Sequence, residues 1–161
     1  MDLNKLFHPR TVALIGASTE SNKLSGRPLR FFREYGYAGG IYPVNPKYQE
    51  MDGLPCFAKL SDIPGDVDLA VITLPASAVP GALAACGAKG VKAAAIISSG
   101  FAEVGGEGVR LQEDLARVAA ARERDPRERP APEQRALLRR GTHARELCLD
   151  VGGHVGELER L

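Results

Sequence analysis

Short apolar runs alternate along the first 121 residues with segments in which apolar side chains recur at helical spacing. An apolar run of this kind, ended by a turn residue, is typical of a strand that is buried on both faces of a parallel sheet. The sequence predicts four such strands: Thr11–Ile15, Ile41–Val44, Asp68–Leu74 and Lys92–Ile97.

Three helices are predicted between and after these strands: Pro28–Tyr35, Ala78–Ala88 and Gly108–Ala121. Pro28 suits the first turn of a helix, and Gly90 suits a C-terminal cap. In the last helix, Val109, Leu111 and Leu115 share one side. The alternation of strands and helices predicts an α/β fold, a Rossmann-like doubly wound parallel sheet with right-handed crossovers.

The sequence changes in character after residue 121, so we divide the chain into a domain, 1–121, and an atypical Arg/Pro-rich tail, 122–161. The tail contains nine Arg and no Lys, whereas residues 1–121 contain six of each. The charged, proline-containing segment 122–130 cannot form the buried fifth strand that should follow. We therefore expect a sheet that is incomplete at its last strand, with Lys92–Ile97 as an unpaired, aggregation-prone edge and a marginally stable domain.

Two origins of the tail remain open. One is a shifted reading frame in a GC-rich gene, which the change in composition favours. The other is a natural charged extension. Much of the tail has the composition of a disordered segment, although Glu133–Leu149 could form a short helix with a weak apolar pattern.

Composition and charge exclude several classes of protein. The 161 residues are 44% apolar and 25% charged, and the net charge is +1. This near-neutral balance gives no general attraction to nucleic acid or to an anionic membrane. No apolar run approaches the length of about 20 residues that crosses a bilayer, and the first ten residues do not resemble a signal peptide. We expect a cytoplasmic protein with no nucleic-acid or membrane partner.

Metal and catalytic patterns are missing as well. The three cysteines, Cys56, Cys86 and Cys148, are too far apart for a zinc site and odd in number for a disulfide framework. The three histidines are scattered. We identify no metal ligands, nucleophile or general base, and hence no catalytic residue.

Ligands of doubly wound sheets bind outside the carboxyl ends of the strands. The first of these turns contains Gly16, where the backbone can approach a ligand closely, and Ser18. The longer loop that follows supplies Lys23 as a possible phosphate partner. The second turn contains Asn45 and Lys47, where an NAD-binding domain would have a carboxylate for the ribose. A cation at this point suits a ribose with an additional phosphate, as in NADP or coenzyme A (CoA).

The remaining two turns complete the predicted pocket. Pro75 gives a stiff apolar wall that could face an adenine ring, and Ser98 and Ser99 offer hydroxyl groups beside free backbone amides. Taken singly, each turn is also compatible with an ordinary solvated loop.

Four segments jointly resemble a known family. They are residues 12–18 (VALIGAS), 41–47 (IYPVNPK), 67–72 (VDLAVI) and 90–101 (GVKAAAIISSGF). In this order and spacing they resemble the N-terminal CoA-binding domain of ADP-forming (NDP-forming) acetyl-CoA or acyl-CoA synthetases, which is related to the alpha subunit of succinyl-CoA synthetase. The resemblance covers about residues 5 to 121.

The resemblance implies that the chain binds CoA or acyl-CoA at the carboxyl ends of its strands. By position, Ser18 corresponds to a contact in the first loop, Lys47 to the basic residue near the phosphates, and Ile97, Ser98 and Ser99 to a third contact segment. Asn45 and Pro75 would form pocket walls. The full enzymes also need a phosphohistidine domain and an ATP-grasp domain, as further domains or subunits. Neither fits in this chain, so we expect no catalysis by the chain alone.

Other functions stay open. The chain could be a stand-alone CoA-binding module or the regulatory CoA-binding part of a protein acetyltransferase. A fragment of an NADP-dependent oxidoreductase is compatible with Asn45 and Lys47, but no catalytic residue supports it.

Overall fold

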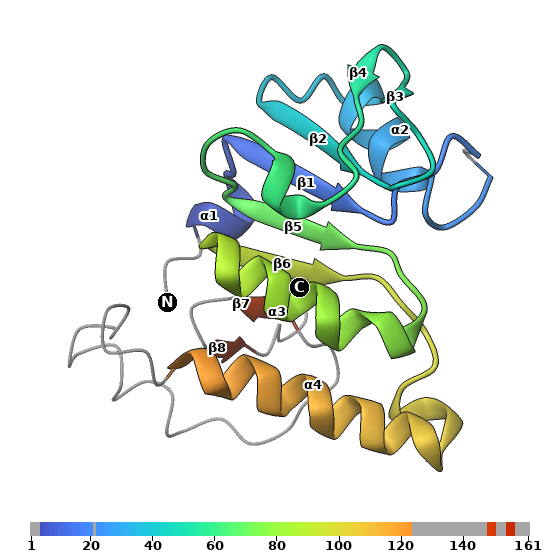
Figure 1. Ribbon diagram of the computed structural model, residues 1–161, viewed down its shortest axis with the longest axis vertical. Helices are drawn as coiled ribbons and strands as arrows, with labels where there is room; N and C mark the ends of the chain where they lie inside the picture. The colour runs from blue at the N-terminus through green and yellow to red at the C-terminus, as the bar shows by residue number, and fades with distance from the viewer. Residues whose placement is uncertain (1–3, 21, 124–147, 151–153, 157–161) are drawn as a thin grey trace.

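The computed structural model describes residues 4–20, 22–123, 148–150 and 154–156. Strands and helices alternate as the sequence predicts (Figure 1). The helices are α1 (Asn4–Phe7), α2 (Arg27–Glu34), α3 (Val79–Lys89) and α4 (Glu107–Glu123). The strands are β1 (Thr11–Ile15), β2 (Gly40–Val44), β3 (Glu50–Met51), β4 (Leu54–Pro55), β5 (Leu69–Ile72), β6 (Ala93–Ile96), β7 (Cys148–Asp150) and β8 (His154–Gly156). Short 3-10 turns are η1 (Leu60–Asp62), η2 (Ala76–Ala78) and η3 (Ala102–Val104).

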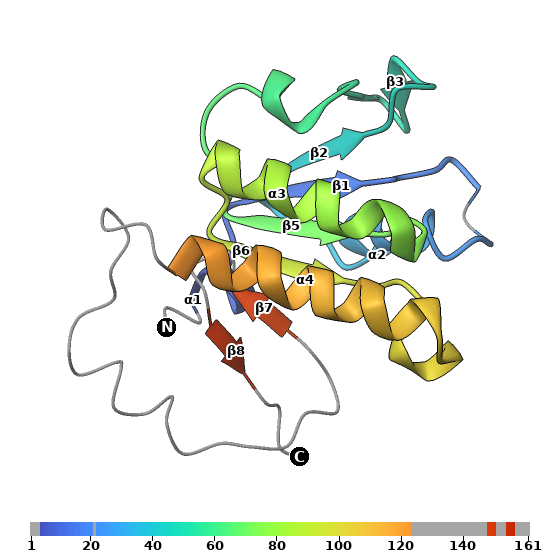
Figure 2. The same cartoon turned by 60° about the horizontal axis from the view of Figure 1, so that its bottom comes forward.

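A parallel sheet of four strands, in the order β2-β1-β5-β6, forms the centre of the molecule. Helices α3 and α4 cover one face of this sheet and α2 lies on the other (Figures 1 and 2). The sheet starts with β1 in its middle, continues with β2 on one side and is then extended by β5 and β6 on the other. The Rossmann-like, doubly wound α/β fold is thereby confirmed.

Alternate residues of each central strand belong to two separate apolar clusters. Ala13 and Ala70 pack on the side of α3 and α4, together with Leu83 and Leu115. Val12 and its neighbours on β5 pack on the side of α2. Because both faces are buried, the strands must be apolar at every position, which explains the continuous runs in the sequence.

The outer edge of β6 corrects one sequence-based expectation. We expected this edge to be unpaired, but β7 pairs with it in antiparallel orientation, with Ala94 opposite Leu149 and Ala95 opposite Cys148. Strand β8 then pairs with β7. The expectation was wrong because pairing uses backbone N–H and C=O groups, which a segment can supply whatever its side chains are.

Most of the predicted tail, 122–161, lies outside the described residues. The helix predicted over Glu133–Leu149 lies there up to residue 147, and at residues 148–150 the structure has strand β7 instead. The shifted reading frame and the disorder of the tail stay predictions.

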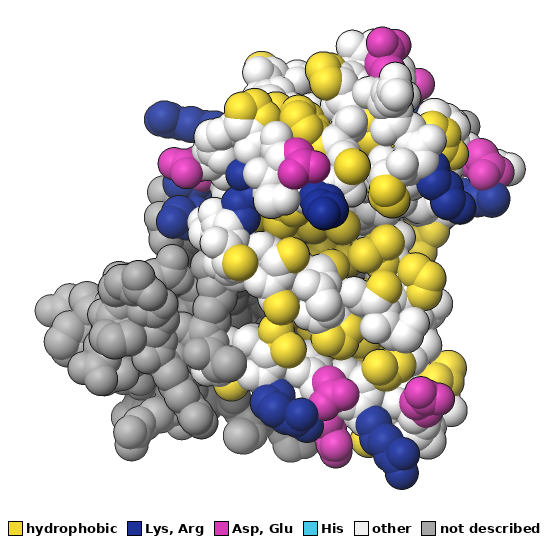
Figure 3. All heavy atoms as spheres, in the orientation of Figure 1, with side chains coloured by type: hydrophobic (Ala, Val, Ile, Leu, Met, Phe, Trp, Pro, Cys, Tyr) yellow, Lys and Arg dark blue, Asp and Glu magenta, His cyan; other side chains and the backbone are white. Residues whose placement is uncertain are grey.

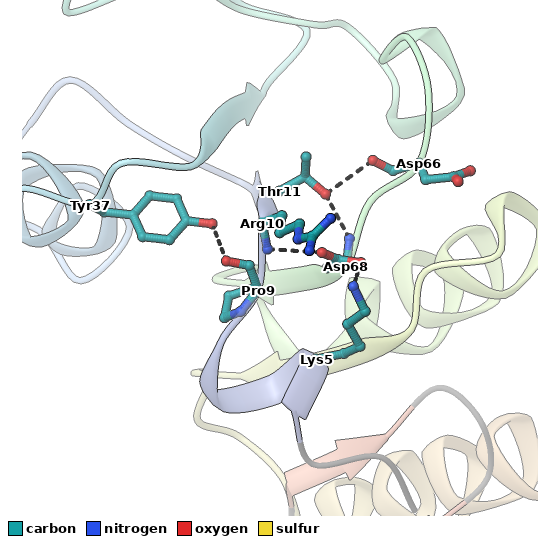
Figure 4. A network of polar contacts seen from close by, with 7 residues as sticks. All are labelled: Lys5, Pro9, Arg10, Thr11, Tyr37, Asp66 and Asp68. Atoms are coloured by element: carbon teal, nitrogen blue, oxygen red, sulfur yellow. Dashed lines mark hydrogen bonds and ion pairs between the residues drawn. The ribbon is translucent and has the colours of Figure 1, made fainter.

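A buried carboxylate fastens the start of the chain to the sheet, at the end of the strands where β1 begins (Figure 4). Asp68 accepts a hydrogen bond of 2.8 Å from the backbone N–H of Arg10 and forms an ion pair of 2.9 Å with Lys5. Its own N–H donates to Thr11 Oγ1 at 2.9 Å. Burial raises the pKa of Asp68, but the Arg10 N–H and the Lys5 ammonium outweigh it, so the pKa lies below its usual value. Asp68 thus joins α1 and β1 to β5.

Candidate functional site

An open pocket of about 870 Å³ lies at the carboxyl ends of the parallel strands. Figure 3 shows a hydrophobic hollow next to α3, with basic side chains at its rim. The pocket is bounded by the turns after β1, β2 and β5, by the segment around η1 and by one side of α3. Its lining residues are Ile15, Gly16, Ser25, Val44, Asn45, Pro46, Lys47, Ala58, Lys59, Leu60, Ser61, Thr73, Leu74, Pro75, Ala82, Ala85, Ala88 and Lys89.

Gly16 forms the floor of the pocket where β1 ends. Its N–H donates to the carbonyl of Val44 at 2.9 Å, and its φ of +84° lies in the left-handed region. A Cβ at this position would lie 2.7 Å from Leu74 Cδ2 and 2.8 Å from the carbonyl oxygen of Thr73. Only glycine therefore lets the turns after β1 and β5 come this close.

Asn45 connects two turns of the pocket. Its Nδ2 donates to the carbonyl of Ala17 at 2.8 Å, and its Oδ1 accepts from the N–H of Lys47 at 2.9 Å. Its backbone carbonyl accepts a 3.5 Å hydrogen bond from Cys56 Sγ. Burial raises the pKa of this thiol, and the contact with Asn45 lowers it by less. Asn45 thus orients the turn that carries Lys47.

Three lysines line the pocket, and they differ in their partners. Lys89, at the end of α3, donates from Nζ to the carbonyl of Ile63 at 2.7 Å. Lys47 and Lys59 have no ion pair with any carboxylate in the described part of the chain. Among the described residues that line the pocket there is no Asp or Glu. These residues therefore offer cationic groups to an anionic ligand.

The predicted phosphate partner in the first loop is placed differently. Lys23 forms a 2.7 Å ion pair with Glu20 and does not line the pocket. Ser18 Oγ accepts a hydrogen bond from the N–H of Glu20 at 3.1 Å and is also outside the lining. The side chains of Ser18 and Lys23 thus contact residues of their own loop.

The third predicted contact segment also lies outside the pocket lining. Ser98 Oγ donates to the carbonyl of Leu74 at 2.6 Å, and Ile97 lines a groove on the α2 face of the sheet. The amides after Ser99, which we expected to be free, are not. The N–H groups of Gly100 and Phe101 donate to the carboxylate of Glu103, at 2.5 and 3.1 Å.

The carboxylate of Glu103 is stabilised by these contacts. The N–H of Gly100, the N–H of Glu103 itself and the N–H of Phe101, in this order, hold its pKa below the usual value, against a smaller effect of burial. In this conformation the segment caps itself with its own carboxylate.

The structure therefore brings together four of the predicted site residues, Gly16, Asn45, Lys47 and Pro75. Ser18, Lys23, Ile97, Ser98 and Ser99 do not line this pocket. Sequence analysis missed five polar lining residues: Ser25, Lys59, Ser61, Thr73 and Lys89. No motif marks them. Lys59, Ser61 and Lys89 come from segments that only the fold brings to the strand ends, whereas Ser25 and Thr73 lie in the turns after β1 and β5.

The part of the chain that the structure describes contains no cluster of three or more His, Cys, Asp or Glu side chains able to hold a metal ion. None of the described helices has the length and apolarity that a bilayer crossing requires.

Comparison with known proteins identifies the family of the chain. Residues 10–127 match the family model described as a CoA binding domain. An ADP-forming acetate–CoA ligase I of Archaeoglobus fulgidus is 44% identical over 117 residues, which are 73% of this chain and 17% of that enzyme. The alpha subunit of acetate–CoA ligase I of Pyrococcus furiosus is 44% identical over 123 residues, 74% of this chain and 27% of that subunit.

Solved structures show the same relationship. The dinucleotide-forming acetyl-coenzyme A synthetase 1 of Ca. Korarchaeum cryptofilum, in its apo form, superposes with a TM-score of 0.70 at 44% identity, over 74% of this chain and 26% of that one. A conserved hypothetical protein of Pyrococcus furiosus gives a TM-score of 0.55 at 26% identity, over 68% of this chain and 87% of that one. The chain thus spans about a quarter or less of the ligases that it matches. With its sheet, its pocket and the match over residues 10–127, the chain belongs to the CoA binding domain family.

Proposed function

We propose that the pocket at the strand ends holds CoA, or an acyl-CoA, and that the chain is the CoA-binding part of an ADP-forming acyl-CoA ligase. The observation that carries the proposal is the turn after β2. It presents Lys47 to the pocket at the place where an NAD-binding domain has a carboxylate for the ribose. The ligase relatives, of which the chain matches only part, support the assignment to this class.

The remaining features of the pocket suit the adenosine end of CoA. Leu74 and Pro75 offer an apolar wall, and Ala82 and Ala85 of α3 leave room beside it. Gly16 lines the pocket without a side chain, so the backbone of the protein can approach the ligand there. Such a pocket binds and orients CoA, and no described residue in it is placed to act as a nucleophile or base. We therefore propose that the acyl transfer depends on further domains or subunits and takes place in the cytoplasm.

Calorimetric titration tests the proposal. The purified chain is titrated with CoA and with NADP, alongside Lys47→Ala and the control Lys92→Ala, whose exposed lysine precedes β6 at the opposite end of the sheet. We expect binding of CoA in preference to NADP, and a loss of about tenfold in CoA affinity for Lys47→Ala only, as for one charged hydrogen bond. No CoA binding in a folded chain, or equal affinity for NADP, contradicts the proposal.

A free-standing CoA-binding module is the second candidate. The Pyrococcus furiosus protein that is matched over 87% of its own length favours it, because there this fold makes up nearly a whole chain. The flanking coding sequence distinguishes the two candidates: an adjoining ATP-grasp segment supports the ligase, an adjoining acetyltransferase domain supports a regulatory part of that enzyme, and an isolated gene supports the module.

A further inference from the structure

Lys59 lines the pocket but belongs to no motif and to none of the segments by which the chain resembles its family. We propose that Lys59 is a specificity-determining residue, which together with Lys47 binds the phosphate on the ribose of CoA and makes the site discriminate CoA from dephospho-CoA. This inference rests on the proposed function of the pocket.

The backbone segments that carry the two lysines are paired just before each lysine. The segment before η1 runs parallel to the end of β2, with Val44 bridged to Phe57. The N–H of Phe57 donates to the carbonyl of Pro43, and the N–H of Asn45 donates to the carbonyl of Phe57, both at 2.9 Å. The paired residues Asn45 and Phe57 each stand two positions before one of the lysines. Both lysines then line the pocket.

The carboxylate nearest to Lys59 in sequence is engaged elsewhere. Asp62 accepts hydrogen bonds from the backbone N–H of Lys59 at 3.2 Å and from Ser61 Oγ at 3.0 Å. It fixes the turn of η1 and forms no ion pair with the Lys59 ammonium. The turn is therefore held in place while the lysine side chain stays available.

The contacts of the other basic side chains favour Lys47 and Lys59 as the pair that binds the phosphate. Lys89 is tied to the carbonyl of Ile63, and Lys23 is neutralised by Glu20. Two like charges beside one pocket repel each other, and an anion between them relieves that repulsion. A phosphate monoester carries a charge of about −1.5 to −2 near neutral pH and therefore suits two ammonium groups better than one.

The position of the two lysines in the fold indicates which phosphate of CoA they bind. In doubly wound domains the end of the second strand lies at the ribose of the nucleotide. A second lysine at this place favours a ribose that carries a phosphate over one with free hydroxyl groups. CoA has this phosphate and dephospho-CoA lacks it, although the two are otherwise the same ligand.

The experiment compares the two ligands on matched variants. CoA and dephospho-CoA are titrated calorimetrically into the unmodified chain, Lys59→Ala, Lys59→Arg and the control Lys92→Ala, with circular dichroism confirming that each is folded. We expect the unmodified chain to prefer CoA at least tenfold. Lys59→Ala should lower CoA affinity by about five- to tenfold and leave dephospho-CoA affinity unchanged, as the loss of one charged contact predicts. Lys59→Arg should retain most of the preference.

The possible results separate the two proposals. If CoA binds but Lys59→Ala weakens both ligands equally, or neither, Lys59 has no role in recognising the phosphate and the inference is wrong while the proposed function stands. If the folded, unmodified chain binds neither ligand, both proposals fail. Raising the salt concentration adds a second readout, because the preference for CoA should shrink in the unmodified chain and stay small in Lys59→Ala.

Discussion

The side chain of Asn45 donates a 2.8 Å hydrogen bond to the carbonyl of Ala17 and so joins the turn after β2 to the turn after β1. Removing this donor leaves a partly buried carbonyl without a partner, which costs about 1 kcal/mol or somewhat more. We expect Asn45→Ala to lower the free energy of unfolding by this amount and to weaken CoA binding severalfold, because Lys47 loses its orientation. Urea denaturation and calorimetry measure the two effects.

Asn45→Asp sharpens this test. The carboxylate can still accept from the N–H of Lys47, but it cannot donate to Ala17. It should therefore be at least as destabilising as Asn45→Ala. Asn22→Ala serves as the control, since it removes an exposed amide side chain from the neighbouring loop. An Asn45→Ala variant as stable as Asn22→Ala would show that the link between the turns is unimportant.

Gly16 and Gly65 form a matched pair for testing the close approach of two turns. Both have positive φ, +84° and +74°, but a Cβ would meet Leu74 and Thr73 only at Gly16 and nothing within 4 Å at Gly65. We expect Gly65→Ala to cost about 1 kcal/mol from backbone conformation alone. Gly16→Ala should cost about 2 to 4 kcal/mol, because the clash is added.

Denaturation of both glycine variants in urea measures the difference. If the two variants lose equal amounts of unfolding free energy, the turn after β5 moves away from the new side chain at residue 16 without any loss of stability. Gly16→Ala should also weaken CoA binding, whereas Gly65→Ala should leave it unchanged, because Gly65 does not line the pocket.

Asp68 makes stability depend on acid. Its pKa is lower in the folded chain than the value of about 4 of an unfolded Asp. Its contribution is therefore fully present above about pH 4 and is lost as the pH falls through the lower, folded value. We expect Asp68→Asn to lower the free energy of unfolding at pH 7 by about 2 kcal/mol, since Lys5 and the N–H of Arg10 lose a charged partner.

The pH dependence of urea denaturation checks this prediction, with Asp66→Asn as the control because its exposed carboxylate lies two residues away. Lys5→Ala should cost about 1 kcal/mol or less, as Lys5 is more exposed than Asp68. The double variant Lys5→Ala, Asp68→Asn should lose less than the sum of the two, and additive losses would contradict the ion pair.

Glu103 should titrate below its usual range. The N–H groups of Gly100 and Phe101 donate to its carboxylate, and its pKa is lowered chiefly by the first of these bonds. The stabilisation it gives the loop is present above the unfolded pKa and disappears as the pH falls through the lower, folded one. NMR of the side-chain carboxyl resonances during an acid titration should show that the pKa of Glu103 lies below the usual value of a glutamate.

Glu103→Gln provides the structural control for this titration. It should speed hydrogen exchange at the amides of Gly100 and Phe101 by removing the charge that they contact, whereas Glu113→Gln on the exposed side of α4 should not change it. Unchanged exchange in Glu103→Gln would show that the cap is not formed in solution.

Sequence analysis predicted the central architecture well for a simple reason. Strands β1 and β5 are almost wholly buried and β2 and β6 are buried in part, so their apolar runs stand out from the helices between them. The turns at their carboxyl ends follow directly from the strand positions. The family resemblance, which rests on those turns and strands, is confirmed by the CoA binding domain match.

Two groups of short strands escaped this reasoning. Strands β3 and β4 are two residues long each and carry no periodic pattern. Strand β7 pairs with β6 through its backbone, and such a pairing leaves little trace in the side chains. In both cases the hydrogen bonds come from segments whose composition does not mark them as strands.

By itself, the sequence determined the order of strands and helices, the doubly wound sheet and the end of the sheet at which the pocket lies, because burial of the central strands dictates which positions are apolar. Only the tertiary structure decided which polar residues surround the pocket. It brought Lys59 beside the turn of Lys47, directed Lys23 to Glu20 and closed the amides of Gly100 and Phe101 with Glu103. The position of Lys59 depends on the pairing of two backbone segments, and the other two contacts depend on the conformation of their loops. The spacing of residues along the sequence specifies neither.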